Sequence, residues 1–156
     1  MADRKPPRAV GEREILRAAW QYQRDSLVKK VTGVSEDDAR RSPVGSGTTL
    51  LWLTQHVCMA ERLWVRNRFA GESAPISGDI VPSDTLAEAI ANYQAEWPVI
   101  DAVVDGYHLD EAMDDPNGGD IPVTLRWIIV HLIEELARHA GHADILRELI
   151  DGDTGR

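Results

Sequence analysis

Four long segments of the chain carry apolar residues at the spacing of an α-helix, and no segment reads convincingly as a β-strand. We predict long helices over residues 11–31, 49–69, 84–104 and 124–150, and a short helical piece capped by Ser35. Because helices of this kind must bury their apolar faces against one another, the predicted fold is all-α, an antiparallel four-helix bundle.

Loops are predicted where proline, glycine and acidic residues cluster, at residues 42–48, 71–82 and 105–122. Ser83 is a candidate N-cap for the third long helix. Pro98 lies inside that helix and is expected to kink it or split it, because proline removes a backbone donor and clashes with the preceding turn.

A chain of 156 residues fits one domain, which we place at residues 11–151 between a disordered N-terminal tail, 1–10, and a C-terminal tail, 152–156. The single cysteine, Cys58, excludes an internal disulfide and favours a cytoplasmic location. A net charge of −9 argues against binding nucleic acid, and no apolar run reaches the ~18 residues of a membrane span. We also expect that the protein can form a homodimer.

The last predicted helix carries a carboxylate and an imidazole, Glu135 and His139, four residues apart and therefore on one face. His131 lies four residues before Glu135. His131 and His139 are ~12 Å apart along a helix, so they cannot both bind one metal ion through bonds of ~2 Å. The pairs His131/Glu135, Glu135/His139 and, less well, His139/His142 all remain open. A further ligand could come from His56 on the second long helix, because catalytic zinc is held by three protein ligands with a fourth position open.

His56 lies on a mostly apolar stripe, so taken alone it could be a core histidine bonded to a backbone carbonyl. A glutamate facing the same core would cost several kcal/mol, and this favours the metal interpretation. Cys58 is about 200° around the helix from His56 and cannot join the site. Glu134 is expected to pair with Arg138. The tryptophans are spaced as core residues: Trp20, Trp52, Trp64, Trp97 and Trp127.

Two of the predicted helices open with similar sequences. Residues 49–56 match residues 124–131 at four positions, which are a threonine, a leucine, a tryptophan and a histidine. If the repeat is real, His56 and His131 occupy related positions on their helices.

The stretches 46–72 and 123–147 resemble the DinB-like superfamily, and more narrowly its mycothiol-dependent, maleylpyruvate-isomerase-like branch. The resemblance implies a bundle with up-down-down-up helix order. It also implies a divalent metal, zinc or nickel, held by a histidine on the second long helix and two ligands on the last. Carried over by position, these ligands are His56, Glu135 and His139.

The resemblance and the open coordination position together predict a metal-dependent transferase. Such an enzyme would activate a low-molecular-weight thiol, such as mycothiol, for attack on an electrophilic small molecule. His131 and His142 are candidate proton shuttles. The alternatives are a metal hydrolase that uses one of these histidines as its base, and a non-catalytic bundle with a structural metal, which usually takes four protein ligands.

Overall fold

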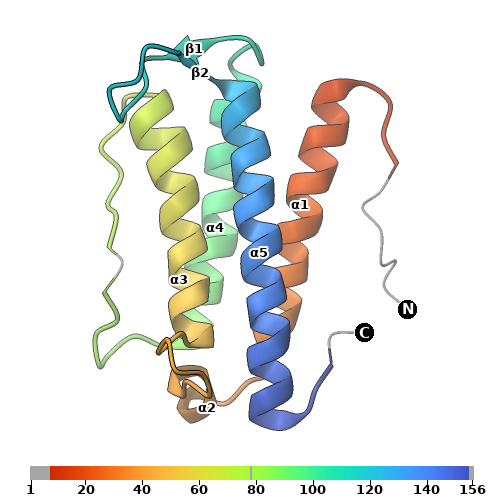
Figure 1. The fold of residues 1–156 in the computed structure, drawn as a ribbon, viewed down its shortest axis with the longest axis vertical. Helices are drawn as coiled ribbons and strands as arrows, with labels where there is room; N and C mark the ends of the chain where they lie inside the picture. Colours follow the sequence, from red (N-terminus) through yellow and green to blue (C-terminus); the bar gives the residue numbers. More distant parts are fainter. Residues whose placement is uncertain (1–7, 78, 155–156) are drawn as a thin grey trace.

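The computed structural model describes residues 8–77 and 79–154, and within them four long helices form a bundle (Figure 1). The third helix continues into a π-helical segment, η1. The helical elements, in chain order, are α1 (Glu12–Val31), α2 (Glu36–Arg40), α3 (Leu50–Glu61), η1 (Arg62–Phe69), α4 (Leu86–Asp105) and α5 (Leu125–Asp151). The all-α bundle predicted from the sequence is therefore confirmed.

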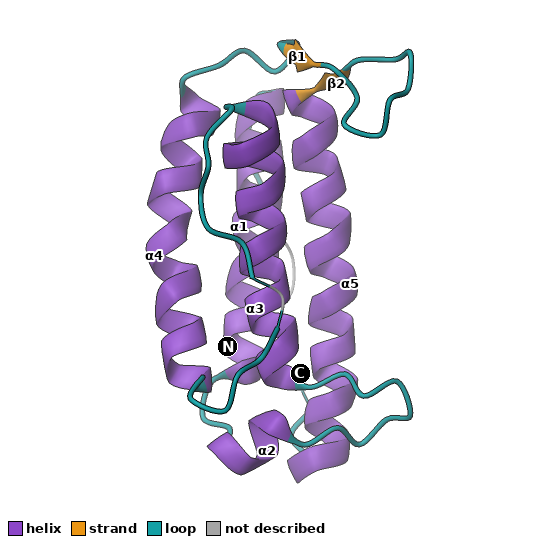
Figure 2. Ribbon diagram, turned by 90° about the vertical axis from the view of Figure 1, so that its left-hand side faces the viewer, coloured by secondary structure: helices purple, strands orange, loops and turns teal. Residues whose placement is uncertain are grey.

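The long helices follow the up-down-down-up order that the resemblance implies. In Figure 1, α1 and α5 run in one direction and α3 and α4 run in the other. Because α3 and α4 are parallel, the connection after η1 travels back along the length of the bundle before α4 begins (Figure 1). A second view shows α1 between α4 and α5 on the opposite side from α3 (Figure 2).

A serine or a threonine side chain caps the start of each α-helix after α1 in the described part of the chain. Ser35, Thr49 and Thr124 each accept a hydrogen bond from the backbone N–H three residues later. At its C-terminal end α5 stops at Gly152, whose positive φ of 78° suits a residue without a side chain.

The start of α4 differs from the prediction, because Thr85 caps the helix in place of Ser83. The carboxylate of Asp84 accepts a hydrogen bond from the backbone N–H of Val81, which closes a turn through Ser83. Of the two outcomes predicted for Pro98, a split of the helix does not occur, since α4 continues from Leu86 to Asp105 with Pro98 inside it; a kink at Pro98 stays a prediction.

A small antiparallel β-ladder corrects the expectation that the chain has no strand. Strand β1 (Ala112–Met113) pairs with β2 (Val123–Thr124) across the acidic connection between α4 and α5. Two-residue strands are too short to show an alternating pattern in the sequence. Their pairing fixes the chain just before α5 begins at Leu125.

The interior of the bundle is apolar, but not every tryptophan belongs to it. Trp20 is buried, whereas the Trp127 side chain is 48% exposed, so its assignment to the core was wrong. In the described part of the chain, no helix combines the length and the apolar character that crossing a membrane requires. Residues 8–10 precede α1 without helical structure. The rest of the predicted N-terminal tail, and residues 155–156 of the C-terminal tail, lie outside the described residues.

One charged cluster lies in the core and ties α1, α3 and α4 together. Glu61, with no exposed surface, accepts hydrogen bonds from the Trp20 indole at 2.9 Å and the Tyr93 hydroxyl at 3.0 Å. It also forms an ion pair with Arg24, which is 1% exposed, at 2.7 Å. Arg24 in turn contacts Asp101 at 2.9 Å. A buried charge is tolerated only when its partners satisfy it, and here three side chains do so.

We expect Arg24→Ala or Glu61→Ala to lower the free energy of unfolding by about 3–5 kcal/mol, because each variant leaves an unpaired charge in the core. Urea unfolding followed by circular dichroism would measure the loss. Replacing both partners, as Arg24→Met with Glu61→Leu, should cost less than the two single changes added together. An exposed ion-pair variant, Arg41→Ala, should be nearly neutral. An equally small effect of Glu61→Ala would contradict the interpretation.

Candidate metal centre

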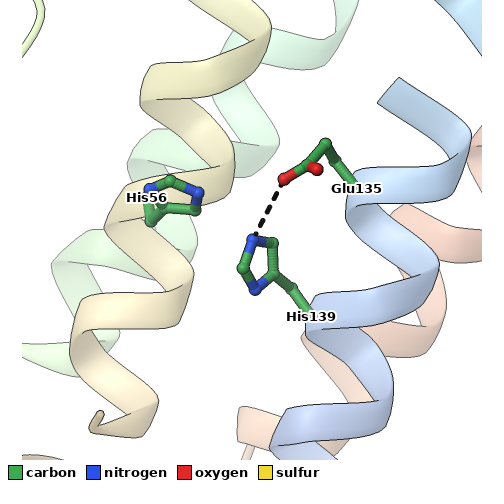
Figure 3. A group of neighbouring side chains, drawn as sticks. All are labelled: His56, Glu135 and His139. Carbon is green, nitrogen blue, oxygen red and sulfur yellow. Dashed lines mark ion pairs between the residues drawn. The ribbon is translucent and has the colours of Figure 1, made fainter. Parts of the chain in front are cut away.

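His56 on α3 faces Glu135 and His139 on α5, across the interface between these two antiparallel helices (Figure 3). One possible ligand atom from each residue lies within 4.8 Å of the other two. Glu135 and His139 are one turn apart, and the imidazole Nε2 of His139 is 3.3 Å from Glu135 Oε2. The structure thus brings together the three residues that the resemblance selects.

This donor set fits a divalent metal ion. Two ligand atoms bound to zinc at ~2.1 Å in a tetrahedral arrangement are about 3.4 Å apart, which is close to the separation between His139 and Glu135. Two imidazoles and one carboxylate are ligands that zinc and nickel both accept. In the described part of the chain the cluster has three members, so a fourth coordination position would remain for solvent or substrate.

Burial keeps both imidazoles of the cluster in the neutral form that a metal requires. Burial lowers the pKa of His56, although the nearby Glu135 carboxylate opposes the shift. Burial also lowers the pKa of His139, helped by the charge that His56 would carry, while Glu135 again opposes. Neutral imidazoles present a free lone pair, so protons would not compete with a metal at neutral pH.

The guanidinium of Arg138 holds Glu135 in its ionised form. Partial burial acts to raise the pKa of Glu135, but the charge and hydrogen bond of Arg138 outweigh it and leave that pKa below its usual value. Arg138 pairs with Glu135 at i,i+3, and not with Glu134 as expected. The i,i+3 spacing is visible in the sequence, yet it does not say which glutamate faces the arginine.

Trp52 covers the cluster on the α3 side. Its indole stacks on the His56 ring, with centroids 4.6 Å apart and 16° between the planes, and meets the His139 ring edge-on at 6.3 Å. His139 is 8% exposed, and its Nδ1 atom is buried without a hydrogen-bond partner among the described residues. The indole therefore fixes the orientation of His56 and keeps water from one side of the site.

The two histidines predicted as proton shuttles occupy different surroundings. His131 stacks on Trp127 at 5.0 Å and packs against Trp64 at 4.9 Å, outside the three-residue cluster. Of the pairs that helix geometry permits, Glu135/His139 is the one that meets His56. His142 is exposed and lies beside the site, with its ring 5.6 Å from that of His139. A role for either histidine in proton transfer stays a prediction.

The weak sequence repeat has a counterpart in the structure. Thr49 caps α3 and Thr124 caps α5, and each accepts a hydrogen bond from the N–H of a tryptophan. The same tryptophans, Trp52 and Trp127, stack on histidines one turn later, with 16° and 12° between the ring planes. His56 and His131 therefore hold equivalent places on their helices, but only His56 meets the ligands of α5.

Cys58 lies away from this centre. It lines a cavity of about 490 Å³ formed by α3, α4 and the preceding connection, and none of the three clustered residues lines that cavity. Burial raises the pKa of Cys58 to about 11, with the Arg62 charge opposing the shift. A thiol with this pKa is a poor nucleophile at neutral pH.

We expect His56→Ala, Glu135→Ala and His139→Ala each to lower the affinity for zinc by more than about tenfold, because losing even an outer-shell partner typically costs that much affinity. Elemental analysis after zinc loading and dialysis would measure the occupancy. His108→Ala, in an exposed position, and His131→Ala should keep full occupancy. Metal retained in His139→Ala and lost in His131→Ala would show that the wrong pair had been chosen.

Cys58 should react slowly with iodoacetamide in the native protein. With a pKa of about 11, only about one thiol in a thousand is ionised at pH 8. Mass spectrometry of native and urea-unfolded samples should show fast alkylation only after unfolding. Equal rates in the two samples would mean that the thiol is accessible and ionised.

Comparisons with known proteins bear on the fold and the family of this chain. A solved structure described as the conserved protein of locus from Enterococcus faecalis superposes with a TM-score of 0.74 at 13% identity, covering 93% of this chain and all of that one. At this identity the likeness concerns the fold alone. The comparison with curated proteins finds no match. Residues 15–152 match the mycothiol-S-transferase family, in agreement with the resemblance seen in the sequence, and the chain therefore belongs to that family.

Proposed function

We propose that the protein is a metal-dependent S-transferase that joins a low-molecular-weight thiol, mycothiol by preference, to an electrophilic small molecule. The observation that carries the proposal is the meeting of His56, Glu135 and His139 in a chain of the mycothiol-S-transferase family. Three protein ligands and an open position are typical of catalytic metal sites, whereas structural zinc usually has four.

A divalent cation bound there, zinc or nickel, would lower the pKa of a bound thiol so that the nucleophilic thiolate exists at neutral pH. The protein's own groups prepare this chemistry. Arg138 keeps Glu135 ionised, burial keeps His56 and His139 neutral, and Trp52 shields one side from water. In the transfer, the sulfur forms a bond to the electrophilic carbon as the leaving group departs, and the thiol proton passes to solvent; a shuttle role for His131 or His142 stays a prediction.

The other candidate functions receive less support. A hydrolase would need a general base besides Glu135, which serves as a ligand and is paired with Arg138. His131 is packed against two indoles and His142 is exposed, so neither is visibly prepared as a base. A protein nucleophile is disfavoured because Cys58 lies away from the cluster. The cytoplasmic location and the homodimer stay predictions from the sequence.

We expect conjugation of mycothiol with 1-chloro-2,4-dinitrobenzene to require both the thiol and the bound metal, and to continue in Cys58→Ser. The reason is that the sulfur comes from the added thiol, while Cys58 is buried elsewhere. Absorbance of the dinitrophenyl thioether would measure the rate in zinc-loaded and chelator-treated protein.

Two results would contradict the proposal. One is metal-dependent cleavage of an ester or amide without any thiol, which would support a hydrolase. The other is loss of conjugation in Cys58→Ser at unchanged metal content, which would mean that the protein supplies the nucleophile. Glutathione in place of mycothiol provides the control for thiol preference.

A further inference from the structure

A half-open cavity of about 240 Å³ lies beside the metal centre, where the loop between α2 and α3 approaches the C-terminal half of α5. It is separate from the larger cavity that contains Cys58, because the two share no lining residue. The residues that line it are Val44, Ser46, Thr48, His142, Ile145 and Leu146.

His142 connects this cavity with the cluster. Its ring forms part of the cavity wall and lies 5.6 Å, centroid to centroid, from the ring of His139. A molecule seated in the cavity would therefore be separated from the metal ligands by one imidazole.

The lining of the cavity favours an apolar occupant. Val44, Ile145 and Leu146 supply aliphatic surface, and the hydroxyls of Ser46 and Thr48 are hydrogen-bonded to each other at 3.0 Å. A polar molecule buried here would lose hydrogen bonds to water, and the aliphatic part of the lining offers none in return. An apolar cavity of about 150 Å³ is large enough to hold benzene, so this one has room for a single substituted ring.

Ile145 supports the same interpretation. Its side chain is 57% exposed although it is aliphatic, and it stands at the edge of the cavity. With the half-buried Val44 and the buried Leu146 it forms an apolar part of a concave wall, as sites for small molecules commonly have.

We propose that this cavity binds the apolar part of the electrophilic substrate and so decides which electrophiles the enzyme accepts. The inference rests on the proposed function and deepens it by naming the substrate class: small electrophiles that carry one ring or a short aliphatic group. Low-molecular-weight thiols are rich in amides, hydroxyls and charges, so their bodies suit the aliphatic lining poorly. Ile145 and Val44 are the residues that set the specificity.

The first test measures binding without turnover. Unreactive 1,3-dinitrobenzene is titrated into the zinc-loaded protein, and amide chemical shifts are followed by NMR. We expect the largest changes at Val44, Thr48 and Leu146. Ile145→Trp, which fills the cavity from its rim, should raise the dissociation constant at least fivefold, and Val44→Phe should do the same from the loop. The matched control is Leu149→Trp, one turn further along α5 and equally exposed at 55%, which should bind as the wild type does.

The second test uses steady-state conjugation of 1-chloro-2,4-dinitrobenzene, in which a carbon–sulfur bond forms and chloride leaves. Ile145→Trp should raise the KM for the electrophile at least fivefold and leave the KM for mycothiol and the zinc content unchanged. Chemical-shift changes confined to other regions would overturn the inference, as would unchanged dinitrobenzene binding in both cavity-filling variants. Binding in the cavity without any conjugation would support the site while refuting the transferase function, so the two proposals fail separately.

Discussion

The orientation of α3 depends on the buried carboxylate of Glu61. Hydrogen bonds from Trp20 and Tyr93 and the ion pair with Arg24 attach this face of α3 to α1 and α4. His56 lies five residues earlier, about 140° around the helix, and therefore points toward α5. Rotating α3 enough to remove His56 from α5 would also pull Glu61 away from its partners and leave an unpaired charge in the core. The stability of the bundle and the geometry of the candidate site are thus linked through one helix.

The interface between α3 and α5 carries most of the features that bear on function. Near the start of α5, Trp64, Trp127 and His131 pack against one another. The candidate metal-binding cluster occupies the next turns, and the apolar cavity lies beyond it toward the C-terminal end of α5. Positions spaced by about one turn lie on the same face of α5, so these three features follow one another along that face.

Features that depend on neighbouring residues were the easiest to predict. The four long helices and the cap at Ser35 follow from apolar spacing and local hydrogen bonding, and the structure confirms them. The start of α4 was placed too early because Asp84 closes a turn that competes with a cap at Ser83. The strands β1 and β2 were missed because two residues show no alternation. Trp127 was assigned to the core by spacing alone, although its ring lies at the surface.

By itself, the sequence determined that Glu135 and His139 share a helical face, because one helical turn sets that distance whatever the rest of the chain does. It equally allowed Glu135 to pair with His131. Helix geometry left that choice open, and within the sequence only the family resemblance favoured His139. The tertiary structure supplies the physical reason, since the choice depends on which turn of α5 meets His56 when two helices distant in the chain pack together. The same packing created the cavity beside His142, which joins a loop to a helix about a hundred residues away. Contacts between such distant segments follow from how the whole core is packed, and the periodicity of a single helix does not predict them.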